Sequence, residues 1–102
     1  MRQLRNIHPG EVLKEEFLKP MGISVYRVSK ETGLSQTRLG QVIKGKRAMS
    51  AETAVKLGKF FATPPEFWMN LQSLYDIEDA RKRYKKDIES IQSIKGLKED
   101  VA

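Results

Sequence analysis

The sequence predicts an all-α fold, with five helices in one small domain and a charged helical extension at the C-terminus. Apolar residues recur at spacings of three and four through most of the chain, which is the period of an α-helix. Strand signals are weak, because the chain has no Asn-Gly hairpin turn and no long alternation of Val, Ile and Thr. The 102 residues suffice for one modest core. We expect a domain over residues 1–75 and the extension over residues 76–102.

Each predicted helix has its own start and stop signals. The five helices are expected at Pro9–Leu18, Val25–Glu31, Gln36–Lys44, Ala51–Phe61 and from Pro64 and Pro65 onward. Hydroxyl side chains that can accept a hydrogen bond from a free backbone N–H precede four of them, at Ser24, Ser35, Ser50 and Thr63. Pro20 is expected to end the first helix, and Gly33 and Gly45 the second and third.

The inward-facing apolar positions of these helices form the expected core. They are Val12, Leu13, Phe17, Val28, Leu34, Leu39, Val42, Ile43, Ala54, Leu57, Phe61, Phe67, Trp68, Leu71, Leu74 and Tyr75. We interpret Trp68 as closing this core rather than as an exposed interface residue. His8 precedes Pro9, and we expect it to cap the first helix or to be solvated.

After Tyr75 the apolar positions narrow to one stripe on a highly charged helix. The stripe consists of Ile77, Ala80, Tyr84, Ile88 and Ile91. Such a stripe needs a surface to lie against, which is this domain, a second copy of the chain or a different protein.

The net charge of +6 lies entirely in the first half of the chain. No acidic residue occurs from Thr32 to Ala51, whereas Arg38, Lys44, Lys46 and Arg47 fall in that segment. A basic segment of this kind favours a polyanionic partner, although an ordinary solvated surface explains the charge equally well.

Composition also narrows the class of protein. The chain has no cysteine and one histidine, and no apolar run is long enough to cross a membrane. The charged N-terminus lacks the apolar region of a secretory signal. No Ser has an identifiable partner base, so no catalytic set is visible. We therefore expect a cytoplasmic protein that is not an enzyme and binds no metal or other cofactor.

The second and third predicted helices form a candidate helix-turn-helix. They are joined by Gly33-Leu34-Ser35, and glycine allows the positive φ that such a tight corner requires. Ser29 supplies the small side chain needed where the two helices cross, and Val28, Leu34, Leu39 and Val42 are placed to hold them together. In DNA-binding proteins the second helix of this motif enters the major groove.

The outward side of the third predicted helix has the chemistry of base recognition. Its candidate base-facing residues are Gln36, Thr37, Arg38, Gln41 and Lys44. Gln pairs with adenine in the major groove, and Arg or Lys pairs with guanine. The candidate phosphate contacts flank this helix and are Ser24, Arg27, Ser35, Lys46, Arg47 and Ser50. Gly40 also lies outward, either because DNA approaches closely or because a surface glycine is tolerated there.

These motifs resemble the phage-repressor-like helix-turn-helix proteins, and in particular the HigA-type, or VapI-like, antitoxins. The resemblance covers about residues 5–83. It is carried by the opening IHPGEVL at residues 7–13, by GKR at 45–47 and by TPPEFWMNLQ at 63–72. It implies a five-helix DNA-binding domain that forms a homodimer, represses its own operon and neutralises a small toxin, a ribosome-dependent mRNA endonuclease.

Two positions depart from the pattern of these relatives. Many relatives carry Gln early in the second helix, where it holds a phosphate, whereas this chain has Val25-Tyr26-Arg27. Gly40 occupies a position where a longer side chain is common. The leading hypothesis is therefore a repressor and antitoxin that binds double-stranded operator DNA. The alternatives are a stand-alone regulator without a toxin and a module that binds only protein.

Overall fold

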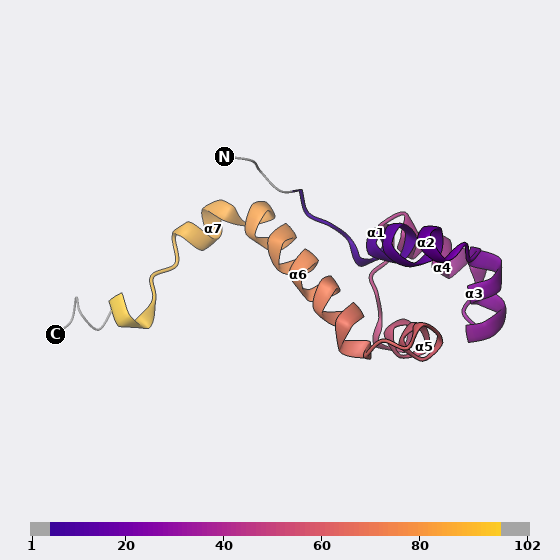
Figure 1. The fold of residues 1–102 in the computed structure, drawn as a ribbon. Helices are drawn as coiled ribbons and strands as arrows, with labels where there is room; N and C mark the ends of the chain where they lie inside the picture. The colour runs from indigo at the N-terminus through magenta and orange to yellow at the C-terminus, as the bar shows by residue number, and fades with distance from the viewer. Residues whose placement is uncertain (1–4, 97–102) are drawn as a thin grey trace.

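The computed structural model describes residues 5–96 as a small helical bundle from which one long helix extends (Figure 1). The elements are α1 (Pro9–Val12), η1 (Leu13–Leu18), α2 (Lys19–Met21), α3 (Val25–Thr32), α4 (Gln36–Ile43), α5 (Ala51–Phe61), α6 (Pro65–Arg83) and α7 (Lys85–Glu89). No strand occurs over the described range. The all-α prediction is therefore confirmed.

The first helix is longer than predicted and contains a wide turn. The elements α1, η1 and α2 follow one another without a break, and η1 has π-helical winding, with the Lys19 N–H donating to the Lys14 carbonyl. The chain passes through Pro20, which has no N–H to donate, and the helix ends at Gly22 with φ +65°. The prediction that Pro20 ends this helix was wrong, because the wide turn accommodates the proline.

The other predicted boundaries depend on local signals and agree closely with the structure. Ser24, Ser35 and Ser50 cap α3, α4 and α5, accepting from the backbone N–H three residues later at 3.1, 3.0 and 3.2 Å. Thr63 does not cap the next helix, which begins after Pro64 without a side-chain cap. The Thr63 hydroxyl instead accepts a hydrogen bond from the Trp68 indole N–H at 2.9 Å. The side chain predicted as a helix cap is therefore used in a side-chain contact with the core.

The core lies where α1, η1, α3, α4, α5 and the start of α6 meet. Its buried apolar residues are Leu13, Leu18, Val28, Leu34, Leu39, Val42, Met49, Ala54, Leu57 and Trp68. The interpretation of Trp68 as core closure is confirmed. Leu74 was wrongly placed in the core and is 65% exposed. It follows Gln72, the last buried residue of α6, where the helix leaves the bundle (Figure 1).

His8 connects three parts of the bundle. It is buried and caps α1, with its Nδ1 accepting from the Gly10 N–H at 2.9 Å. Its ring meets Tyr75 of α6 edge-on, with the ring centroids 4.9 Å apart. Burial lowers the pKa of His8 below its ordinary value, against the opposing effects of Asp76 and a hydrogen bond to the Arg47 backbone. The neutral ring therefore fastens the basic loop after α4 to the core.

The long helix α6 crosses the predicted domain boundary without interruption. It runs on to Arg83, and the chain then turns at Tyr84, with φ −111° and ψ 28°, into the short α7. The extension makes the molecule elongated, with dimensions of 61 × 28 × 22 Å. Over residues 5–96 none of the helices combines the length and the apolar character needed to cross a membrane.

Candidate nucleic-acid interface

The corner between α3 and α4 has the features that the motif requires. Gly33 adopts φ +80°, and its N–H donates to the Ser29 carbonyl at 2.9 Å, which ends α3. Leu34 is 2% exposed and anchors the corner in the core, and Ser35 then starts α4. The glycine allows the chain to reverse between the two helices within three residues.

The helix α4 divides cleanly into a buried and an open side. Leu39 and Val42 are buried, which fixes the helix on the bundle. All five predicted base-facing residues lie on the other side: Gln36, Thr37, Gln41 and Lys44 are exposed, and the Arg38 side chain is 32% exposed. A methyl group built on Gly40 would meet no heavy atom within 4 Å. The open side therefore presents amide, hydroxyl and cationic groups to a ligand and is not covered by the protein itself.

Arg38 is engaged by an acidic residue from α5. Its Nη1 donates to Glu52 Oε1 at 3.0 Å, and the Lys56 Nζ donates to the other carboxylate oxygen at 2.8 Å. These two cations, Lys56 first, lower the pKa of Glu52 below its ordinary value. Arg38 thus lies at the edge of the open side with its guanidinium turned toward α5.

The three predicted phosphate-binding serines all serve as helix caps. A hydroxyl that accepts from a backbone N–H keeps its own hydrogen for a second partner, as Ser24 and Ser35 require for a phosphate contact. The Ser50 hydroxyl also donates to Thr53 Oγ1 at 3.0 Å. A phosphate contact from Ser50 would need this hydroxyl to turn.

The basic loop after α4 is held at both ends. At its start Gly45 has φ +75°, its N–H donates to Val42, and the Lys46 N–H donates to Gln41 at 2.8 Å. At its end the Met49 N–H donates to the buried Gln72 side chain at 2.6 Å. Lys46 and Arg47 are exposed between these anchors. The loop therefore presents two cations beside the open side of α4.

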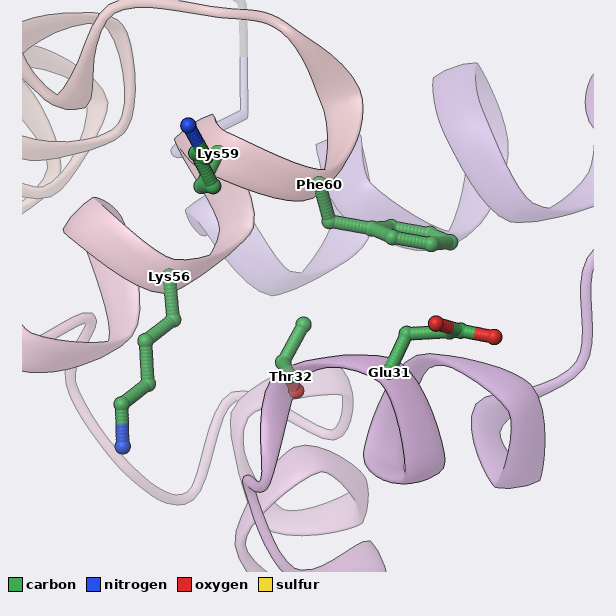
Figure 2. Close-up of a pocket in the computed structure, with 5 residues that line it drawn as sticks. All are labelled: Glu31, Thr32, Lys56, Lys59 and Phe60. Atoms are coloured by element: carbon green, nitrogen blue, oxygen red, sulfur yellow. The ribbon is translucent and has the colours of Figure 1, made fainter.

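Two hollows border α5, one at its start and one further along the helix. One, of about 340 Å³, is lined by Arg38, Arg47, Ala48, Ser50 and Glu52 and so belongs to the predicted DNA-facing surface. The other, of about 350 Å³, is lined by Glu31, Thr32, Lys56, Lys59 and Phe60. In Figure 2 the Phe60 ring lies above the Glu31 carboxylate, and the Lys56 amine extends away from both. None of the predicted DNA-contacting residues lines this second hollow.

Comparison with known proteins decides the family. A helix-turn-helix family model matches residues 14–68, which include most of η1, both helices of the motif and the start of α6. The chain belongs to this helix-turn-helix family. Members of this family that resemble the chain over most of its length include HigA antitoxins and VapI-like homologues, as the sequence motifs predict. The family assigns the chain to DNA-binding regulators and not to enzymes.

Individual relatives align over most of their length. The chain is 38% identical to virulence-associated protein I of Dichelobacter nodosus over 76 residues, covering 74% of this chain and 70% of that protein. It is 33% identical to antitoxin HigA-1 of Vibrio cholerae over 90 residues, covering 88% of this chain and 85% of that protein. The structure matches Pseudomonas aeruginosa antitoxin HigA with the higBA promoter at a TM-score of 0.82 and 37% identity, covering 86% of this chain and 97% of that one.

Sequence reasoning missed two residues that organise this surface of the helix-turn-helix domain. Glu52 follows directly after the acid-free segment, and its place in the first turn of α5 gave no sign that it reaches Arg38. Gln72 is one of the few buried polar residues, and no local pattern marks its bond to the Met49 backbone. Both contacts join segments that are more than ten residues apart.

Proposed function

We propose that the chain is a sequence-specific DNA-binding repressor that acts as the antitoxin of a type II toxin–antitoxin module. The observation that carries the proposal is the open side of α4, which has no acidic residue and is flanked by a fixed basic loop. The likeness to Pseudomonas aeruginosa HigA with the higBA promoter, which covers 86% of this chain, supports it further.

The proposed contacts follow from the chemistry of each group. Gln36, Thr37, Arg38, Gln41 and Lys44 face the bases, where amides pair with adenine and cations with guanine. Ser24, Arg27, Ser35, Lys46, Arg47 and Ser50 hold the phosphates on either side. Phosphate contacts orient the protein on the duplex, and the base contacts provide sequence preference.

The toxin partner and the autoregulation come from the family. We propose that the chain represses its own operon in the cytoplasm and neutralises a small HigB-like mRNA endonuclease encoded beside it. A stand-alone regulator without a toxin is the second candidate. Co-expression with the adjacent reading frame separates the two, because an antitoxin retains a small basic protein through purification and a stand-alone regulator does not.

The C-terminal stripe supports a homodimer. Its large members Ile77, Tyr84, Ile88 and Ile91 are between 44% and 72% exposed, and Leu74, which is 65% exposed, precedes them by three residues. Leu74 and Ile88 lie equally far from Arg81 on its two sides. In two antiparallel copies related by a two-fold axis at Arg81, Leu74 of one copy would lie opposite Ile88 of the other.

Charge favours the same antiparallel pairing. Asp76 and Asp79 precede Arg81 by the same distances at which Lys86 and Arg83 follow it. Two copies crossing at Arg81 would therefore place acidic groups of α6 in one copy opposite basic groups of α6 and α7 in the other. We therefore propose a functional division of the chain, in which the domain at 1–75 binds DNA and the extension at 76–102 forms the dimer interface.

Binding of the wild-type protein to DNA from directly upstream of its own gene tests the proposed function. We expect binding at moderate salt that falls steeply as salt rises, with a logarithmic slope of about −0.9 for each phosphate neutralised. The control is a duplex of the same length and base composition in shuffled order, which should bind more weakly. Equal binding to both duplexes, or no binding to either, would contradict the proposal.

A further inference from the structure

Glu52 is the acidic side chain that borders an otherwise basic surface. It lies in the first turn of α5, and each of its carboxylate oxygens holds one cation: Arg38 from α4 at 3.0 Å and Lys56 from α5 at 2.8 Å. Arg38 and Glu52 also line the same hollow beside Arg47 and Ser50. The carboxylate is therefore within direct reach of the residue best suited to read guanine.

The arrangement is loose enough to open. The Glu52 side chain is 53% exposed, and those of Arg38 and Lys56 are 32% and 40% exposed. Ion pairs at such exposure are screened by water and salt, so they contribute little to folding stability. A ligand that offers Arg38 better acceptors can draw it away from Glu52.

Operator and non-operator DNA compete unequally for Arg38. A guanine edge offers two acceptors, N7 and O6, to one guanidinium, and this paired contact replaces the single bond to Glu52. A phosphate that approaches Arg38 or Lys56 without that base contact meets the negative charge of the carboxylate as well. Glu52 therefore opposes contacts that carry no sequence information more strongly than the contact that does.

We propose that Glu52 determines the sequence selectivity of the α4 surface by keeping Arg38 and Lys56 from binding phosphates nonspecifically. This inference rests on the proposed function, since it assumes that the open side of α4 binds DNA. It assigns to Glu52 a specificity-determining role that needs no contact between Glu52 and the bases. Arg38 is the residue through which Glu52 acts on base preference, and Lys56 is a second cation that it holds back.

The variant E52Q tests the inference, because glutamine keeps the size of the side chain and removes its charge. Releasing two cations should steepen the logarithmic salt slope for the shuffled duplex by up to about 1.8. Affinity for the shuffled duplex should rise about tenfold at low salt, and affinity for the upstream duplex should rise less. The ratio of the two affinities should therefore fall.

Two further variants isolate the cause. E15Q changes the net charge by the same amount and removes a similar exposed pair, Glu15 with Lys19 at 3.2 Å in the first helix. It should leave the affinity ratio unchanged. When Arg38 is already replaced by alanine, E52Q should steepen the logarithmic salt slope for the shuffled duplex about half as much as it does alone, because only Lys56 is then released. Equal melting temperatures for E52Q and the wild type show that the effect arises at the DNA surface and not from lost stability.

The outcomes separate this inference from the proposed function. If the wild type prefers its upstream DNA and E52Q has the same salt slope and affinity ratio, Glu52 has no role in selectivity and only this inference fails. If E15Q lowers the ratio as much as E52Q, the effect is one of net charge and the inference also fails. A wild type with no preference for its upstream DNA overturns the proposed function and this inference together.

Discussion

Gly10 and Gly40 have different roles because the space that a Cβ atom would occupy is filled at Gly10 and empty at Gly40. Gly10 is buried in α1 where the helix lies against the end of α4, and an added Cβ would lie 1.8 Å from the Val42 carbonyl oxygen. Gly40 lies in the middle of α4 with no heavy atom within 4 Å of the same position. The first glycine allows two backbones to meet, whereas the second leaves a gap on the open side.

Replacing these two glycines should therefore shift stability in opposite directions. Gly10→Ala pushes α1 from α4 and should lower the free energy of unfolding by about 2 kcal/mol, since neither backbone can yield cheaply. Gly40→Ala should raise it by about 1 kcal/mol, because alanine favours the helix and has room. Urea unfolding measures both. A destabilised Gly40→Ala variant, or an unaffected Gly10→Ala variant, would contradict the structure.

The same Gly40→Ala protein also separates the two interpretations of this glycine. If a base or sugar approaches the helix at this point, the added methyl lowers affinity for the upstream DNA. If the glycine is merely tolerated at the surface, affinity remains as in the wild type.

At the scale of the helices, α6 has two roles along its length. Its first half closes the core through Trp68, whereas further along the helix Leu74 and Ile77 are exposed. An exposed stripe of this length on a charged helix is typical of a helix that pairs with another. In the proposed homodimer, the paired arms would relate the two copies by a two-fold axis.

Breaking the stripe should convert the dimer into a monomer. Ile77→Gln combined with Tyr84→Gln removes two exposed apolar side chains of the stripe, one on each side of Arg81. The matched control is Lys82→Gln with Glu89→Gln, which alters two exposed residues outside the stripe and leaves the net charge unchanged. Sedimentation equilibrium should give a dimer for the wild type and the control and a monomer for the first variant. A monomeric wild type, or equal masses for all three, would exclude this interface.

Sequence reasoning predicted the elements well where the signals were local. The serine caps, the left-handed Gly33 and Gly45 and the whole of α5 depend on neighbours within one helical turn. The errors arose where a distant partner decided the outcome. Thr63 accepts from Trp68, and Pro20 lies in a helix whose wide turn could not be read from spacing.

In the candidate site, too, the features set by local sequence were predicted and the contact with a distant residue was not. The periodicity of α4 was enough to place Gln36, Thr37, Gln41 and Lys44 on the open side, because the buried Leu39 and Val42 fix the rotation of the helix. The partner of Arg38 was not foreseen. Glu52 reaches Arg38 only because the fold brings the start of α5 beside the start of α4.

At the scale of the whole molecule, the bundle and the arm formed by α6 and α7 differ in both charge and shape. The positive surplus lies in the bundle that holds the helix-turn-helix, whereas the arm formed by α6 and α7 carries both signs. An arm that extends away from the bundle can pair two copies while leaving both α4 helices open (Figure 1). Two such helices suit half-sites about one helical turn, roughly 34 Å, apart on DNA.

The most direct test of the central claim measures how substitutions on α4 and in the basic loop change binding to the upstream and shuffled duplexes. Arg38→Ala or Gln41→Ala should weaken binding to the upstream DNA by about 1–3 kcal/mol and relax its sequence preference. Lys46→Ala should weaken binding to both duplexes alike and reduce the salt slope by about one. Lys82→Ala, on the arm, serves as the control. If all three variants of the DNA surface bind the upstream DNA as the wild type does, α4 does not read DNA.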